Sequence, residues 1–218
     1  TGSVVTTLPS IKIDDQRILS SDSILSLDRI PKSLIVLGAG AVGTEFASVF
    51  AHVGSQVTIV EFMPNLLPIE DIDSSKELEK FFKRRKIDVM TSTKFESIET
   101  TPTGVKVIVT LPDGTKKTLE AEYFLSAVGR APVTKGIGLE KTNIQLMPKG
   151  TIQVDAMMRT SVAKVYAIGD LVHGPALAHK SMEEGVIAVE HAAGLDPHPL
   201  DYENIPGATF CTPNVASF

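Results

Sequence analysis

The segment that most constrains the fold of this 218-residue chain is LIVLGAGAVGTEFASVFAHVGSQVTIVE, at residues 34–61. An apolar run leads into a glycine cluster, then a helical pattern, and then a second apolar run that ends on an acid. The pattern predicts a strand at 33–37, a helix at 41–53 whose apolar residues share one face, and a strand at 56–60. Such a strand–helix–strand unit is typical of α/β proteins with a parallel sheet.

Three glycines have the spacing G-x-G-x-x-G between the first strand and the helix: Gly38, Gly40 and Gly43. In this context the first glycine permits a tight turn, the second lets a pyrophosphate approach the backbone, and the third lets helix and strand pack closely. The pyrophosphate then accepts hydrogen bonds from free N–H groups at the helix start. Because Glu61 ends the second strand at the required distance, the segment predicts a dinucleotide site.

Glu61 also indicates which dinucleotide is bound. A carboxylate at this position accepts hydrogen bonds from the adenosine ribose hydroxyls, and it repels a 2′-phosphate. No arginine or lysine follows Glu61 before Lys76, so the adjacent sequence offers no cation for a 2′-phosphate. We therefore expect NAD rather than NADP.

Further α/β elements follow this unit. A helix is predicted at 72–86, with capping residues near Asp71 at its start and the buried stripe Leu78, Phe81 and Phe82. Residues 87–90 form a short strand, and GVKVIVTLPDGTKKTLEAE at 104–122 predicts an antiparallel hairpin around Pro-Asp-Gly. A return strand is predicted at 123–128, and these elements together form a nucleotide-binding α/β unit.

The pattern is less regular after residue 135. Residues 165–170, VYAIGD, are predicted to form a short buried strand, and 175–191 a helix. The tail ATFCTPNVASF, at 208–218, has the pattern of one strand with nothing to pair with.

Composition excludes several functions. A net charge of −5 disfavours a nucleic-acid surface, and the basic run at 83–86 suits the end of a helix. No apolar run is long enough to span a bilayer. Cys211 is the single cysteine, so the chain contains no cysteine pair, and we interpret it as a packed thiol. His173 and His191 lack partners at metal spacing, so we predict no metal site.

Three more motifs occur in a fixed order after the glycine loop: SAVGRAP at 126–132, VYAIGDL at 165–171 and GPALAHK at 174–180. Together with Thr1-Gly2-Ser3 they make the chain resemble the FAD- and NAD-binding disulfide oxidoreductases, and among these most closely the dihydrolipoyl dehydrogenases. The resemblance implies a Rossmann-like FAD/NAD(P)-binding domain, a parallel sheet with helices plus an antiparallel hairpin, flanked by incomplete pieces of the FAD domain.

The resemblance also implies a division of the chain. Residues 1–30 would end the first FAD-domain segment and form a linker, and 31–135 would be the NAD-binding domain. Residues 136–205 would be the second FAD-domain segment, and 206–218 the start of a truncated dimer-interface domain.

The family's cofactor sites map onto two sets of residues. The NAD set comprises Gly38, Ala39, Gly40, Ala41, Val42, Gly43, Thr44, Glu45, Glu61, Phe95 and Gly129. The FAD set comprises Thr1, Gly2, Ser3, Asp170, Ala176, Leu177, Ala178 and His179. In the NAD set, Phe95 matches a family position near the adenine of NAD. Glu45 matches an acid that faces the flavin in the family. A histidine at a helix start is a candidate acid or base in catalysis. We interpret the role of His179 as positional instead, with its backbone at the helix start facing the flavin.

The resemblance further implies a parent enzyme that oxidises protein-bound dihydrolipoamide and reduces NAD through a redox disulfide and FAD. The cysteine pair, the acid–base histidine and the first FAD glycine loop of that family do not occur in this sequence. We therefore expect no catalytic residue in this chain, no activity in isolation and no retained FAD.

The implied partners are an identical subunit and the acyltransferase core of the 2-oxoacid dehydrogenase complexes, with no nucleic acid or membrane. The implied location is cytoplasmic in a bacterium and the mitochondrial matrix in a eukaryote. Alternatives that stay open are the NAD-binding part of a mercuric reductase, an NADH peroxidase or oxidase, or a transhydrogenase. A nucleotide-binding module without catalysis is a further alternative.

Overall fold

The computed structural model describes residues 2–218, which form two compact units. Unit 1 contains the residues up to Val4, Arg130–Gly207 and Phe218, and unit 2 contains Val5–Gly129 and Ala208–Ser217. Residues 5–30 and 208–217 belong to the same unit as the glycine loop. The division into domains that the resemblance implies stays a prediction.

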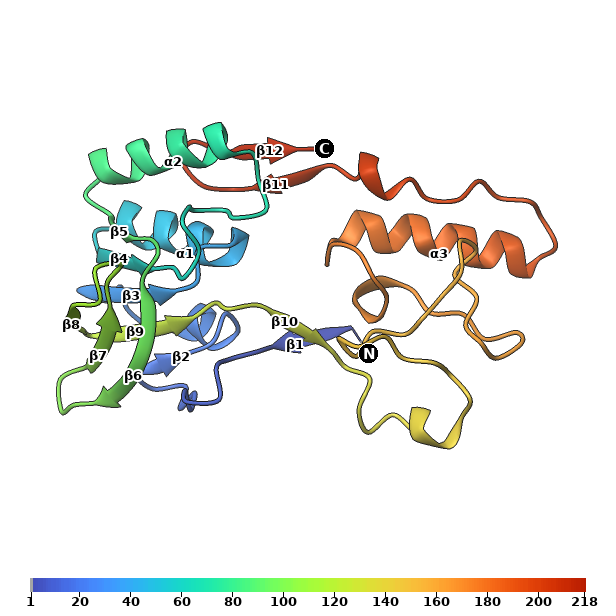
Figure 1. Cartoon of the computed structure of the whole chain (residues 1–218), viewed down its shortest axis with the longest axis horizontal. Helices are drawn as coiled ribbons and strands as arrows, with labels where there is room; N and C mark the ends of the chain where they lie inside the picture. The colour runs from blue at the N-terminus through green and yellow to red at the C-terminus, as the bar shows by residue number, and fades with distance from the viewer. Residues whose placement is uncertain (1) are drawn as a thin grey trace. The chain divides into compact units, whose positions relative to one another are not determined.

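The centre of unit 2 is a parallel five-stranded sheet with the order β2-β9-β3-β4-β5 (Figure 1). Its strands are β2 (Ile18–Leu19), β3 (Ser33–Leu37), β4 (Gln56–Val60), β5 (Asp88–Met90) and β9 (Tyr123–Ser126). β3 lies between β4 and β9, so the chain leaves β3 toward one side of the sheet and later returns on the other. This order confirms the predicted parallel α/β fold and creates a topological switch point beside β3.

An antiparallel three-stranded sheet completes unit 2: β6 (Lys94–Thr100), β7 (Val105–Thr110) and β8 (Lys116–Ala121). β7 and β8 are the predicted hairpin, with Thr110 paired to Lys116 across the Pro-Asp-Gly turn. β6 was not predicted, because its apolar residues do not alternate regularly over KFESIET.

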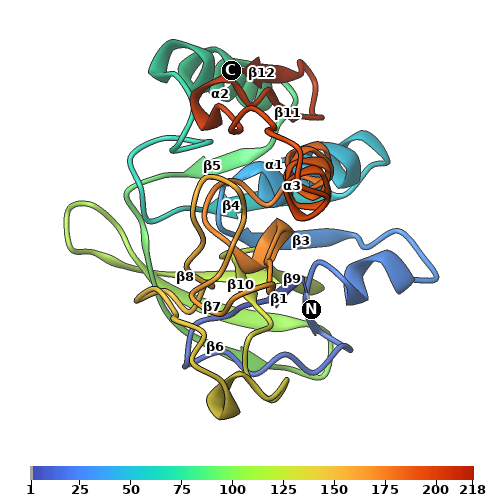
Figure 2. The same cartoon turned by 90° about the vertical axis from the view of Figure 1, so that its right-hand side faces the viewer.

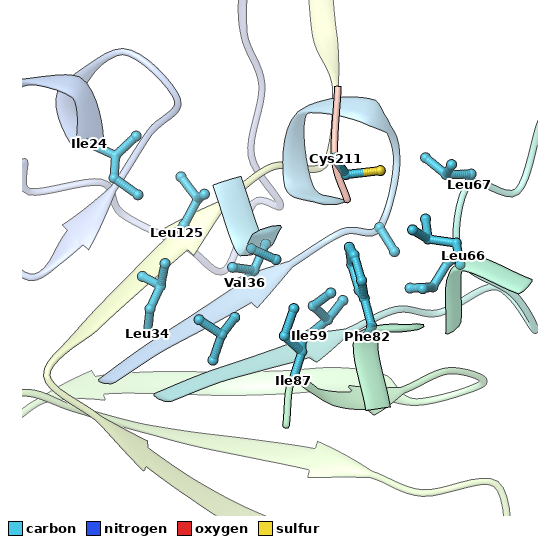
Figure 3. Packing of buried hydrophobic residues seen from close by; sticks show 14 of the residues in the cluster. Ile24, Leu34, Val36, Ile59, Leu66, Leu67, Phe82, Ile87, Leu125 and Cys211 are labelled. Carbon is cyan, nitrogen blue, oxygen red and sulfur yellow. The ribbon is translucent and has the colours of Figure 1, made fainter. Parts of the chain in front are cut away.

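Both faces of the parallel sheet are buried. Leu34 and Val36 of β3 pack on the helix side, whereas Ile35 and Leu37 pack against the antiparallel sheet. Figure 3 shows the helix side, where Phe82 and Ile87 join the strand residues. Because side chains alternate along a strand, a strand buried on both faces must be apolar throughout, as SLIVL nearly is.

Two helices cover the face of the parallel sheet on which Leu34 and Val36 lie: α1 (Ala41–His52) and α2 (Ile72–Arg84). The predicted cap of α2 is confirmed, since the Asp71 side chain accepts hydrogen bonds from the N–H groups of Asp73 and Ser74. A short 3₁₀ helix, η1 (Ser23–Ser26), precedes β3.

The apolar face predicted for the first helix is not its buried face. Gly43, Thr44, Ala47 and Ser48 are the buried residues of α1. Val49 is 53% exposed, and Val42 and Val53 are exposed as well. Helix and sheet approach so closely at this point that only small side chains fit between them. Of the predicted face, Phe46 and Phe50 are half-buried and pack at the edge of the core, whereas the three valines are exposed.

The tail was wrongly predicted to be a strand without a partner. It forms two strands that pair with each other, β11 (Gly207–Thr209) and β12 (Val215–Ser217). They lie beside α2 in both views (Figures 1 and 2). Cys211, in the turn between them, is only 6% exposed and belongs to the core of Figure 3. Burial and the Glu45 carboxylate raise the pKa of its thiol to about 11, in accord with a packed thiol.

Unit 1 has little regular structure apart from α3 (Ala178–Ala192). β1 (Ser3–Val5) pairs with β10 (Arg130–Pro132). Three 3₁₀ helices complete the unit, namely η2 (Leu139–Lys141), η3 (Gly169–Leu171) and η4 (Tyr202–Asn204).

The strand predicted at VYAIGD is absent from the described part of unit 1. Tyr166 makes a single antiparallel bridge to Arg159, and the segment then enters η3. An apolar run becomes a strand only where another strand lies alongside it, and the described residues provide one bridge. No helix formed by residues 2–218 combines the length and apolar character needed to cross a membrane.

Candidate functional site

A cleft of 560 Å³ opens in unit 2 where three parallel strands end. β3 ends at Leu37, β4 at Val60 and β9 at Ser126, and each is followed directly by cleft-lining residues. The lining comprises Leu8, Leu37, Gly38, Gly40, Val60, Glu61, Phe62, Met63, Pro68, Thr93, Lys94, Phe95, Ala127, Val128 and Gly129. Ligands of open α/β sheets bind at the carboxyl ends of the strands, beside the switch point.

The three glycines of the loop have different surroundings. A Cβ on Gly38, whose φ is +100°, would lie 2.5 Å from the carbonyl oxygen of Ala127. A Cβ on Gly43 would lie 2.0 Å from the carbonyl oxygen of Gly38. A Cβ on Gly40 would meet no atom within 4 Å. The first and third glycines are therefore required by the fold itself, whereas the second leaves open space beside the backbone.

The helix that follows the loop presents free donors to this space. α1 begins after Gly40, and no side chain caps its first turn. Its first regular hydrogen bond joins the Thr44 N–H to the Gly40 carbonyl at 3.0 Å. Ala41 and Val42 are exposed, so their N–H groups and the positive end of the helix dipole are available to an anion.

Glu61 is 7% exposed and fixes the glycine loop to the end of β4. One carboxylate oxygen accepts the Ala39 N–H at 2.6 Å, and the other accepts the Met63 N–H at 2.7 Å. This anchoring role is not evident from the sequence. A carboxylate has about four acceptor positions, so Glu61 retains capacity for the ribose hydroxyls expected from the sequence.

Phe95 and Gly129, both in the predicted NAD set, line the same cleft as Glu61. Phe95 is 8% exposed and packs against Phe124 with a ring-centroid distance of 5.9 Å. Gly129 has a φ of +128°. Lys94 also lines the cleft, although the segment after Glu61 offered no nearby cation. The first residues of β6 supply it, from a strand that was not predicted.

Glu45 lies apart from this cleft. It lines an apolar groove of 620 Å³ on unit 2, with Phe46 and Phe210. Its carboxylate accepts the Phe210 N–H at 2.8 Å. Of the predicted NAD set, Gly38, Gly40, Glu61, Phe95 and Gly129 line the cleft, and Glu45 lines the separate groove.

One of the predicted FAD residues of unit 1, Ser3, contacts another, Asp170. The Ser3 hydroxyl donates to the Asp170 carboxylate. Arg130 in turn donates to the Ser3 hydroxyl at 2.7 Å and to the Ser3 carbonyl at 2.8 Å. Gly2 lies one residue earlier, and Thr1 lies outside the described residues.

A buried ion pair holds the turn that carries Asp170. Lys180 is 1% exposed and Glu184 is fully buried, and their side chains approach to 3.1 Å. Glu184 accepts the Gly169 N–H at 2.7 Å, and Lys180 donates to the Gly169 carbonyl at 3.0 Å. Tyr202 donates to Glu184 at 2.5 Å. Burial and then this hydrogen bond raise the Tyr202 pKa, so its hydroxyl keeps its proton.

This network was missed in the sequence, although Lys180 closes the GPALAHK motif. A lysine and a glutamate at i and i+4 on a helix are ordinarily a solvated surface pair. The only signal was that Lys180 is the last residue of the motif and that Glu184 follows it four residues later.

The helix start predicted to face a flavin is the start of α3. Leu177 is its N-cap residue without a side-chain cap, and Ala178 is its first residue. Ala176 and His179 are exposed. The His179 ring nitrogen Nε2 lies 2.8 Å from the Pro206 carbonyl oxygen, so the side chain is used within unit 1.

Known proteins share the sequence pattern and the fold of this chain. The family model for pyridine nucleotide-disulphide oxidoreductases matches residues 1–185. Dihydrolipoyl dehydrogenase 2, mitochondrial, from Arabidopsis thaliana is 43% identical over 218 residues, which are 100% of this chain and 43% of that protein. Dihydrolipoyl dehydrogenase from Mycobacterium bovis is 45% identical over 219 residues, covering 100% of this chain and 47% of the relative.

The solved structure of LpdA from Mycobacterium tuberculosis superposes with a TM-score of 0.92 at 34% identity. The match covers 99% of this chain and 46% of that protein. The chain therefore spans less than half the length of the relatives it matches.

Proposed function

Because the chain belongs to the pyridine nucleotide-disulphide oxidoreductase family, we propose that unit 2 binds NAD in the cleft at the ends of β3, β4 and β9. The observation that carries this proposal is the contrast among the glycines. Gly38 and Gly43 are packed against backbone, whereas Gly40 faces open space at an uncapped helix start. An empty space next to free N–H groups is what a pyrophosphate requires.

The remaining lining residues suit the rest of the dinucleotide. Glu61 would accept hydrogen bonds from the adenosine ribose, and Phe95 and Met63 offer apolar surface for the adenine. Ala127, Val128 and Gly129 form the wall on the β9 side, where the nicotinamide half would leave the cleft. A nicotinamide nucleotide supplies or accepts a hydride, so the task of these residues is to bind and orient it.

We further propose that the full-length protein is a flavoenzyme of the dihydrolipoyl dehydrogenase type. In that reaction the substrate dithiol is oxidised to a disulfide, and its two electrons and one proton reach NAD⁺ as a hydride, with the second proton released. FAD, when bound, would carry the electrons between thiols and nicotinamide.

The residues of unit 1 fit part of an FAD molecule. The Asp170 carboxylate, held by Ser3, suits hydroxyls of a ribityl chain. The uncapped start of α3 at Ala178 suits the electron-rich edge of a flavin. The proposed partners remain an identical subunit and the acyltransferase core of a 2-oxoacid dehydrogenase complex. The proposed compartment is the mitochondrial matrix in a eukaryote or the cytoplasm in a bacterium.

We expect the chain alone to bind NADH and to prefer it over NADPH by at least about tenfold, because a 2′-phosphate would meet the Glu61 carboxylate. Replacing Glu61 with Gln should weaken NADH binding about tenfold or more and narrow the preference, since a charged acceptor for the ribose is lost. Calorimetric titration with both nucleotides measures this. Equal binding of the two by the unaltered chain would contradict the proposal.

We also expect the purified chain to carry no FAD and to form no NADH from NAD⁺ and dihydrolipoamide, even with FAD added. The sequence contains one G-x-G-x-x-G loop and one cysteine. Binding the diphosphate of FAD as well as that of NAD needs a second such loop, and a thiol–disulfide couple needs a second cysteine. An absorbance spectrum and a turnover assay check both points. A stoichiometric flavin band, or NADH formation that depends on dihydrolipoamide, would refute this expectation.

A further inference from the structure

Lys94 is the only cation in the described lining of the nucleotide cleft. It lies at the Glu61 end, because the N–H of its neighbour Thr93 donates to the Glu61 carbonyl at 2.9 Å. Glu61 marks the adenosine ribose, and the ribose carries the 2′-phosphate that distinguishes NADPH from NADH. A lysine at this place would ordinarily favour NADPH, since its flexible stem lets the ammonium reach a phosphate.

The ammonium of Lys94 is already engaged by Glu96, two residues further along β6. Lys94 Nζ lies 3.2 Å from Glu96 Oε1. The same oxygen accepts the Thr110 hydroxyl at 3.0 Å, which fixes the carboxylate against β7.

The local backbone is unusual at this point. The pairing register of β6 on β7 shifts between Phe95 and Ser97, so Glu96 has no partner residue of its own. Register shifts of this kind re-aim a side chain next to a site. The hydrogen bonds from Lys94 and Thr110 lower the Glu96 pKa, so the carboxylate is charged at neutral pH.

We propose that Glu96 is a specificity residue of the nucleotide site, which keeps the Lys94 ammonium paired and so withholds it from a 2′-phosphate. The proposal rests on the proposed NAD site in unit 2. In this account Glu61 repels the 2′-phosphate directly, and Glu96 removes the one cation that would offset that repulsion.

The test is Glu96→Gln in the complete 218-residue chain, titrated with NADH and NADPH. Removing a negative charge near an anion strengthens the binding of both nucleotides to some extent, so the decisive quantity is the ratio of the two affinities. Glu99→Gln is the matched control, because Glu99 is on the same strand, loses the same charge and pairs with Lys106 at 3.7 Å. Lys106 does not line the cleft.

Glu96→Gln should shift the NADPH/NADH affinity ratio toward NADPH by about three- to tenfold, the size expected for one released surface cation. Glu99→Gln should leave the ratio unchanged, and adding Lys94→Met to Glu96→Gln should remove the shift. An unchanged ratio, the same shift with Glu99→Gln, a shift that persists without Lys94, or NADPH binding that stays undetectable would each overturn the proposal.

The two proposals fail in different ways. If the unaltered chain binds neither nucleotide, the NAD site itself is refuted and the role of Glu96 falls with it. If NADH binds with the expected preference and the variants do not change the ratio, only the role of Glu96 is refuted.

Discussion

Replacing Gly43 with alanine is expected to destabilise the chain by about 3 kcal/mol or more. The added methyl group would lie 2.0 Å from the Gly38 carbonyl oxygen. Neither atom can move alone, because the oxygen belongs to the backbone and the position of a Cβ is set by the backbone of its own residue. α1 would have to shift away from β3, and the small buried contact of Ala47 and Ser48 would open with it. Urea unfolding followed by circular dichroism measures the loss.

Gly40→Ala is the matched control for this change. Its methyl group would meet no atom within 4 Å, and its φ of −70° suits any residue. We expect a stability loss of about 1 kcal/mol or less, from the poorer helix cap. NADH binding should nevertheless weaken by at least about tenfold, because the methyl group enters the space proposed for the pyrophosphate. Equal stability of the two variants would show that the helix–strand contact is not close-packed.

The second large effect is expected at Glu184. Glu184→Gln would leave the Lys180 ammonium buried without a countercharge, and breaking a buried ion pair in this way costs about 3–5 kcal/mol. The loss should be local to unit 1, where Glu184 also holds the Gly169 N–H and the Tyr202 hydroxyl. Amide hydrogen exchange measures it, with α3 expected to lose protection and β3 serving as an internal reference.

Two further variants distinguish the effect of breaking the Lys180–Glu184 ion pair from the effect of any substitution in α3. Glu183→Gln changes an exposed neighbour and should alter protection by no more than about 0.5 kcal/mol. The pair Lys180→Met and Glu184→Gln together should cost less than the sum of the single changes by at least about 1 kcal/mol, since no unpaired charge remains. Additive losses would contradict the account of this network.

The elements that sequence analysis predicted well are those determined by local pattern. β3 and β4 have the predicted bounds, because SLIVL and QVTIV are short apolar or β-branched runs bounded by turn residues. α2 starts where Asp71 caps it. The glycine loop lies at the predicted place, since its three glycines serve one turn and one helix start.

The errors concern strand pairing and core contacts, which the local pattern of a segment does not determine. The 208–218 segment finds its partner strand within itself, and its Cys211 reaches a core formed mostly by residues before 126. VYAIGD, by contrast, has the composition of a strand and only one bridge. Strand composition predicts that a segment will pair if a neighbour is available, and availability is a property of the whole fold.

In the candidate site, too, the local pattern predicted some features, and others depend on the whole fold. The motif located Gly38, Gly40, Gly43 and Glu61. It did not show that the Glu61 carboxylate accepts two backbone N–H groups, or that Lys94 of β6 lines the cleft. Specificity in such a site depends on charges that folding brings together, and the residues that directly follow Glu61 supply only some of them.

An NMR titration of the ¹⁵N-labelled chain with NADH, followed residue by residue, tests NAD binding to unit 2. We expect the amide resonances of Gly40, Ala41 and Val42 to shift most strongly, since their N–H groups would contact the pyrophosphate. Those of Ala178 and His179, at the equally uncapped start of α3, should shift little. Equal shifts at both helix starts, or saturable binding that leaves the glycine loop unchanged, would contradict an NAD site in unit 2.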